Sequence, residues 1–198
     1  MKYFTPQKQR PARSVAQSAK AGFTLIETLV ALAIFTISIV GLVAVTAGGI
    51  NNVTYAKNKI TAMALSAEGV ELIRSVRDNF ALQSTTATGW TDFTSELANK
   101  GCTTGSGCII DAETLTLVGC LSSGCPFMNK YTSANADYYG YKVGTQSSFA
   151  RTILISGVST DEISITSTVS WVQGDGTRSV STQENLLNWF ALPAPVTP

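Results

Sequence analysis

One carboxylate is notable for its surroundings. Glu27 is the only charged residue between Lys20 and Lys57, in a stretch that is otherwise largely apolar. An acidic residue at the centre of a membrane helix costs roughly 2.5 to 3.5 kcal/mol, and the cost falls toward the interface. A carboxylate in such a segment usually has a partner, so Glu27 is the first candidate for a functional residue.

Four cysteines, Cys102, Cys108, Cys120 and Cys125, form the second reactive group. Their spacing lacks the Cys-x-x-Cys pairs of common zinc sites, and the chain has no His to complete one. Outside the cytoplasm an even number of cysteines favours disulfides. We favour Cys102–Cys108 and Cys120–Cys125, because each closes a short loop that contains Gly. The other two pairings, and free thiols, remain alternatives.

Signatures of catalysis are missing from the sequence. The absence of His removes the commonest general base and a frequent metal ligand. The sequence has no Gly-x-Ser-x-Gly elbow, phosphate-binding loop or Gly-x-Gly-x-x-Gly fingerprint. We therefore expect a protein that is not an enzyme and that holds neither a cofactor nor a metal.

The elements that position Glu27 are a basic leader and a membrane helix. Residues 1–22 contain five basic residues and no acidic ones, and the apolar run extends from Phe23 to about Ile50. At about 1.5 Å per residue this run is long enough to cross a bilayer core of about 30 Å. The positive-inside rule keeps the leader in the cytoplasm and places the rest of the chain outside. Gly41, Gly48 and Gly49 either allow close helix approach or are ordinary membrane-helix glycines.

The sequence Gly22-Phe23-Thr24-Leu25-Ile26-Glu27 resembles the type III signal of the type IV pilin and pseudopilin superfamily. The resemblance implies cleavage between Gly22 and Phe23 by a prepilin peptidase, with N-methylation of Phe23. It also implies that Glu27 pairs with the N-terminal amine of a neighbouring subunit during assembly. The implied partners are the peptidase, other pilin or pseudopilin subunits, an inner-membrane assembly platform and the lipid bilayer. An ordinary signal anchor is the alternative.

Removal of the leader changes the charge of the chain. The precursor has 14 basic and 13 acidic residues. Without the five basic residues of the leader, nine basic residues remain against 13 acidic ones, a net charge near −4. Nucleic-acid binding normally needs a basic patch or stripe, so no nucleic-acid partner is expected.

The resemblance and the hydrophobic pattern together predict a pilin-like α+β fold. A long N-terminal helix, half in the membrane and half amphipathic, would pack on a C-terminal antiparallel β-sheet. The expected apolar stripe of the amphipathic half follows helical spacing; it comprises Ile60, Met63, Ala64, Ala67, Val70, Ile73 and Arg77. The expected segments are the leader 1–22, the assembly helix 23–50, its amphipathic continuation 51–80, a variable Cys-containing connection 81–148, the sheet region 149–190 and a loose tail 191–198.

Strands are expected mainly near the C-terminus. Apolar residues alternate with Ser and Thr from Ile163 to Trp171, which indicates a strand with one buried face. Residues 174–177 predict a hairpin turn that leads to a strand at 178–182. A further strand is expected at 149–155, and two short strands are expected in the connection, at 115–118 and 139–143. Trp171 is interpreted as a core residue, while Trp189 and Phe190 either cap the sheet or contact another subunit.

These observations favour a structural and assembly protein. The resemblance extends to the helix end 67–74 and the strand 169–171, which are similar to minor pilins. We therefore expect a minor pilin subunit that is assembled into, or primes, a type IV pilus through its N-terminal helix. A pseudopilin of a type II secretion system is the alternative within the class. A membrane-anchored extracellular module that binds a ligand through its Cys-containing segment is the alternative from another class.

Overall fold

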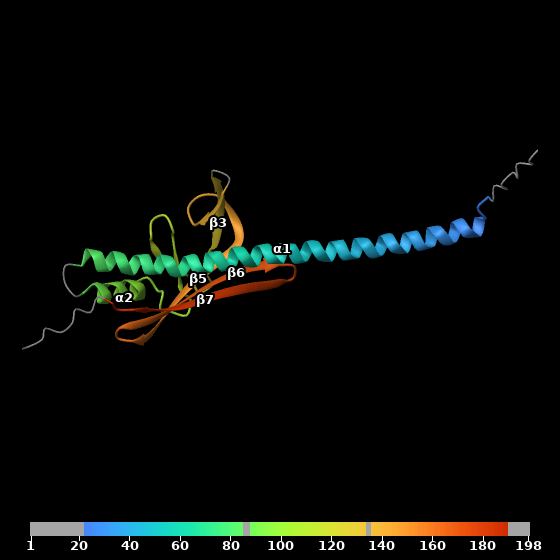
Figure 1. Cartoon of the computed structure of the whole chain (residues 1–198). Helices are drawn as coiled ribbons and strands as arrows, with labels where there is room; N and C mark the ends of the chain where they lie inside the picture. The colour runs from blue at the N-terminus through green and yellow to red at the C-terminus, as the bar shows by residue number, and fades with distance from the viewer. Residues whose placement is uncertain (1–21, 85–87, 134–135, 190–198) are drawn as a thin grey trace, which may run out of the picture. The chain divides into compact units, whose positions relative to one another are not determined.

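A computed structural model describes residues 22–84, 88–133 and 136–189 (Figure 1). Most of the expected leader, Phe190 and the expected loose tail lie outside these residues. The chain divides into two compact units, Met1–Gly49 and Ile50–Pro198. The boundary between the units falls within helix α1, Leu25–Gln83, which has 59 residues.

Helix α1 changes character along its length. Every residue from 22 to 57 is exposed, and the buried positions all come later in the helix. The buried positions are Ala62, Leu65, Ser66, Gly69, Val70, Ile73 and Val76. Of the expected apolar stripe, only Val70 and Ile73 are buried; Ile60, Met63, Ala64 and Ala67 are exposed and Arg77 is half-buried. The prediction of the buried face was wrong because small residues, Ser66 and Gly69, meet the sheet where larger apolar side chains were expected.

Within the described residues, seven antiparallel strands form one sheet. They are β1 (Cys108–Ile110), β2 (Leu117–Gly119), β3 (Phe127–Ser133), β4 (Ala136–Gly140), β5 (Thr145–Ser159), β6 (Glu162–Gln173) and β7 (Gly176–Leu187). Strand β5 pairs with β6 on one edge, while β1 and β3 pair with successive parts of the other edge. The pilin-like α+β fold with an antiparallel sheet is therefore confirmed.

The three C-terminal strands follow the sequence pattern closely. The alternation in β6 buries Ile163, Ile165, Val169 and Trp171, as expected for a strand with one face on the core. The β6–β7 turn includes Gly174, whose φ of 59° lies in the region that favours glycine. Strands β5, β6 and β7 are longer than expected, because ladder pairing extends them past the alternating apolar residues.

The connection after α1 is more regular than expected. It contains α2 (Gly89–Asn99) as well as strands β1 to β4. The sequence signal for α2 is the spacing of three and four residues between Trp90, Phe93 and Leu97, all of which are buried. The expected strands at 115–118 and 139–143 overlap β2 and β4 only in part. The sequence around these elements is polar, so it predicted them only in part. Their buried residues pack against distant parts of the chain, which a local pattern does not reveal.

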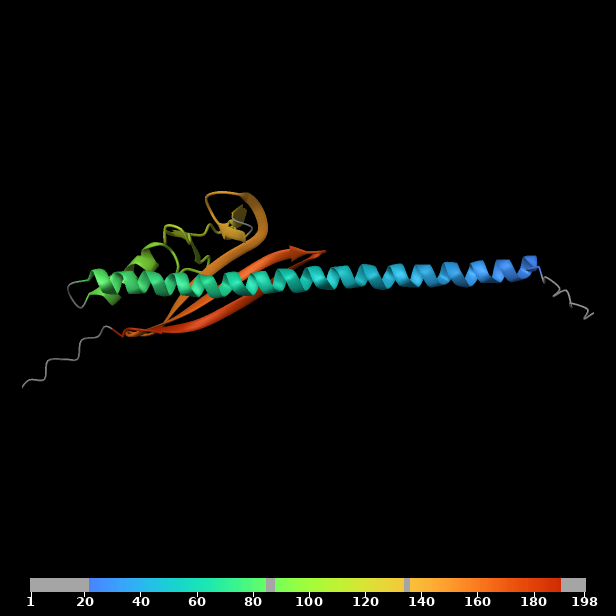
Figure 2. The same cartoon turned by 45° about the horizontal axis from the view of Figure 1, so that its top comes forward.

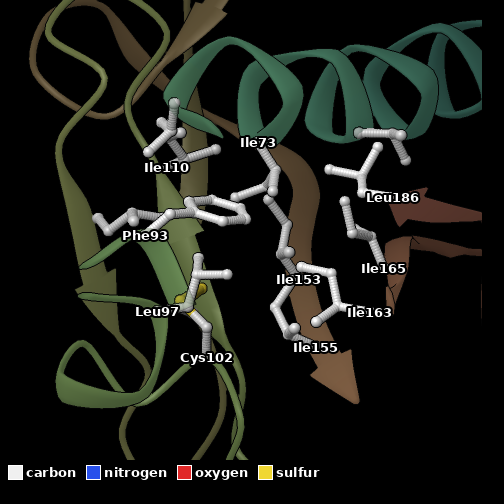
Figure 3. Close-up of a cluster of buried hydrophobic side chains, with 14 of the residues drawn as sticks. Ile73, Phe93, Leu97, Cys102, Ile110, Ile153, Ile155, Ile163, Ile165 and Leu186 are labelled. Atoms are coloured by element: carbon white, nitrogen blue, oxygen red, sulfur yellow. A yellow bond between two sulfur atoms is a disulfide. The ribbon is translucent and has the colours of Figure 1, made fainter. Parts of the chain in front are cut away.

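The main core brings together α1, α2 and the sheet. Figure 3 shows Ile73 of α1 and Phe93 and Leu97 of α2 pointing toward isoleucines of β5 and β6. Phe93 also packs against Trp90 and Phe80, with ring centroids 5.7 and 6.2 Å away. A second cluster surrounds Trp171, and it contains Ala62, Leu65, Met128, Phe149 and Val169. The interpretation of Trp171 as a core residue agrees with its burial.

A buried arginine ties α1 to the sheet. Arg151 of β5 is fully buried and donates hydrogen bonds to the carbonyl of Leu65 at 3.3 Å and to Glu68 Oε2 at 3.0 Å. It also donates to the carbonyl of Ile110 at 2.8 Å, so one side chain joins α1, β1 and β5. A buried charge is costly unless it is paired and hydrogen-bonded, and Glu68 supplies the counter-charge.

We predict that Glu68→Ala lowers the free energy of unfolding by about 1–3 kcal/mol, because it leaves a buried guanidinium without its counter-charge. Glu71→Ala is the matched control, since Glu71 lies one turn away in an exposed pair with Arg74. Its loss should cost no more than about 0.5 kcal/mol. Denaturant unfolding of both full-length variants in detergent measures the difference. Equal effects would mean that the Arg151–Glu68 pair does not hold the helix on the sheet.

Candidate processing and assembly site

The expected cleavage position lies just before α1. Gly22, Phe23 and Thr24 precede the helix, and all three are exposed. Thr24 caps the helix: its hydroxyl accepts a hydrogen bond from the backbone N–H of Glu27 at 3.3 Å. Its carbonyl accepts the first intrahelical bond, from the N–H of Thr28 at 3.2 Å. The sequence Thr24-Leu25-Ile26-Glu27 therefore fits the pattern of a capping box, Thr-x-x-Glu, which could have located the helix start.

The side chain of Glu27 lies in the first turn of α1. A carboxylate at this position interacts favourably with the positive end of the helix dipole. Within the part of the chain that the structure describes, its carboxylate has no ion-pair or side-chain hydrogen-bond partner. The helix thus orders the backbone around Glu27.

Gly22 has no packing role among the described residues. A Cβ built on it would meet nothing within 4 Å, and its backbone does not have the positive φ that would favour glycine. The described part of the chain therefore gives no packing reason for glycine at this position. A requirement for glycine would instead come from a molecule that binds this segment.

The helix that follows presents an uncovered apolar surface. Large apolar residues are exposed along the whole segment, from Phe23 at 81% to Ile50 at 67%. A Cβ built on Gly41, Gly48 or Gly49 would also meet nothing within 4 Å. The helix is long and apolar enough to cross a membrane. These glycines consequently leave room for the close approach of another helix.

Comparison with protein families identifies this segment. Residues 17–43 match the model of the prokaryotic N-terminal methylation motif. This motif supports membership of the type IV pilin and pseudopilin superfamily. The match covers Gly22, Phe23 and Glu27, and it supports a pilin-like protein that is processed by a prepilin peptidase. The motif supports association with other pilins, and within the described residues one apolar helix fits a single-pass membrane anchor. Comparisons with curated proteins and with solved structures return no significant match.

The four cysteines of this pilin-like chain lie in the unit that begins at Ile50, where they form two disulfides. Cys102 bonds to Cys108, and Cys120 bonds to Cys125, the pairing that the short loops favour. Cys102 and Cys108 are fully buried and close the loop between α2 and β1. The Cys120 N–H donates to the carbonyl of Gly107 at 2.9 Å, which fixes the second loop against the first. The disulfides therefore order the connection.

Substitution of Gly22 tests the role of the cleavage position. We predict that Gly22→Val blocks processing and leaves the full-length precursor in the membrane, because the side chain would obstruct the peptidase. Gly41→Val is the control: it makes the same chemical change at a described glycine without contacts and should be processed normally. Gel mobility and N-terminal mass spectrometry measure processing. Cleavage of Gly22→Val between residues 22 and 23 would contradict the assignment.

Proposed function

We propose that this protein is a minor pilin, which is assembled into a type IV pilus or primes its assembly. The chain would insert through an inner-membrane platform, with its basic leader in the cytoplasm and its C-terminal unit outside. In this proposal the protein acts as a structural subunit and not as an enzyme. The observation that carries the proposal is the apolar surface of α1 before Ile50, which is exposed throughout and is preceded by a cleavage motif.

Two contributions to the free energy favour filament assembly in this proposal. The exposed apolar side chains of α1 pass from lipid into contact with other helices, where the glycines permit close packing. Cleavage creates a charged amine on Phe23, which gives the carboxylate of Glu27 on a neighbouring subunit an ion-pair partner. Pairing relieves the cost of a lone charge in apolar surroundings. The helix cap at Thr24 keeps both groups at the very start of the helix.

We predict that Glu27→Val is cleaved normally but enters filaments at least about tenfold less than the wild type. Breaking a buried ion pair costs about 3–5 kcal/mol, which is more than enough for this effect. Glu71→Val serves as the control, because Glu71 is an exposed acid in the later part of the same helix. Sheared filaments and membranes are compared by immunoblot. Incorporation of Glu27→Val at the wild-type level would rule out the pairing mechanism.

A pseudopilin of a type II secretion system would share the same N-terminal motif. The similarity of the helix end and of the β6 segment to minor pilins favours the pilus. The two machines differ in where the C-terminal unit lies, since a pilus reaches the cell surface and a pseudopilus stays in the periplasm.

We expect a membrane-impermeant, amine-reactive biotin reagent to label the protein on intact cells. Lys59 and Lys142 are exposed and provide reactive amines in the unit that begins at Ile50. A periplasmic protein of the same cells is the control for membrane integrity. Labelling only after the outer membrane is permeabilised would identify a pseudopilin.

A further inference from the structure

A groove separates α1 from the β3–β4 hairpin, which stands beside the helix in Figures 1 and 2. Its volume is about 580 Å³, within the range of about 300–1,000 Å³ that is common for small-molecule sites. The assembly surface described above does not include it, because the groove lies entirely in the unit that begins at Ile50. The residues that line it include Lys57, Thr61, Lys130, Asp137, Tyr138 and Tyr139.

The charged residues that line the groove are two lysines, Lys57 and Lys130, and two acids, Glu68 and Asp137. Lys130 forms an ion pair with Asp137 at 2.8 Å, and the Thr132 hydroxyl donates to the same carboxylate at 2.8 Å. Glu68, a further acid of the lining, is already paired with Arg151. Lys130 first, then Thr132 and more distant Lys57, lower the pKa of Asp137, so this carboxylate stays ionised. Among the described residues, Lys57 is the groove cation without an ion pair of its own.

Tyrosines supply both apolar and polar surface. Tyr131 and Tyr138 face each other across the β3–β4 ladder, with stacked rings 5.4 Å apart. Tyr139 is held on the opposite side of the hairpin by an edge-on contact with Phe149, at 5.7 Å. Tyrosine presents a rigid ring and a hydroxyl at a low cost in conformational entropy. A sugar ring matches such a surface, because it has apolar C–H faces and a rim of hydroxyls.

The balance of charge and aromatic surface narrows the class of ligand. Nucleic acids bind to basic stripes that neutralise several phosphates, whereas in this groove Lys57 is the one lining cation without an ion pair among the described residues. A purely apolar ligand would bury Lys57 without a counter-charge, which is costly. We propose that the groove binds an acidic saccharide that carries one carboxylate, with Lys57 binding the carboxylate and Tyr139, on the same face of the hairpin as Asp137, contacting the ring.

The test uses two disaccharides that differ in one group. Cellobiouronic acid and cellobiose share a glycosidic linkage, but only the first has a carboxylate. The mature full-length chain in detergent is titrated with each by calorimetry. We expect cellobiouronic acid to bind with a Kd of about 1 mM or tighter. We expect cellobiose to bind at least about fivefold more weakly, because it lacks the charge-assisted contact.

A pair of lysine variants locates the site. Lys57→Gln should weaken the binding of cellobiouronic acid by about five- to tenfold and leave the binding of cellobiose unchanged. Lys59→Gln is the matched control, because Lys59 is an exposed lysine of the same helix outside the groove lining. Its binding should stay within about twofold of the wild type, since an exposed charge outside the site contributes little.

Three outcomes would overturn the proposal. The first is an absence of binding by cellobiouronic acid. The second is equal weakening by Lys57→Gln and Lys59→Gln, which would indicate general electrostatic attraction. The third is Lys57-dependent binding of tetraglutamate without binding of cellobiouronic acid, which would identify an acidic peptide as the ligand class. None of these results bears on processing at Gly22 or on filament entry through Glu27.

Discussion

The close contact between α1 and β6 at Gly69 sets the distance between helix and sheet, and the rest of the C-terminal unit depends on that distance. A Cβ on Gly69 would lie 2.4 Å from Ser167 Oγ and 3.1 Å from Arg151 Cδ, so glycine alone fits without a shift of its neighbours. Because the helix comes this near, Arg151 can reach the carbonyl of Leu65 and the carboxylate of Glu68. The same spacing closes the core around Ile73 and Trp171.

Two parts of α1 have opposite relations to the rest of the chain. After about residue 60 the helix buries one face against the sheet. Before Ile50 its apolar side chains are exposed, and among the described residues Glu27 has no partner. Removal of apolar surface from water gains roughly 25 cal/mol per Å², so this segment gains free energy when it enters lipid. Any further gain from association with other helices there would come from close packing. The unit that begins at Ile50 buries a hydrophobic core within itself. The apolar helix before Ile50 would be covered by other molecules.

Under these proposals, the groove would bind the saccharide and the helix before Ile50 would enter the filament, so the two functions would use different parts of the molecule. The groove is formed by side chains of α1 and of the β3–β4 hairpin, two elements that are distant in sequence. Between them, α2 and the two disulfides order the polar connection and hold β1 against β5. Sequence variation in the hairpin could change the ligand without affecting the helix that enters the filament.

The sequence by itself determined the features that depend on contiguous residues. The motif from Gly22 to Glu27, the apolar run and the alternation in β6 are local patterns, and each predicted its element correctly. The short loops also favoured the disulfide pairing that the structure contains. Tertiary structure alone decided which face of α1 is buried, because Ser66 and Gly69 pack closely whereas the more apolar Ile60 and Met63 remain exposed. It also brought Lys57 and Asp137 to the same groove and paired Arg151 with Glu68. These residues are distant in sequence, so they come together only when the chain folds.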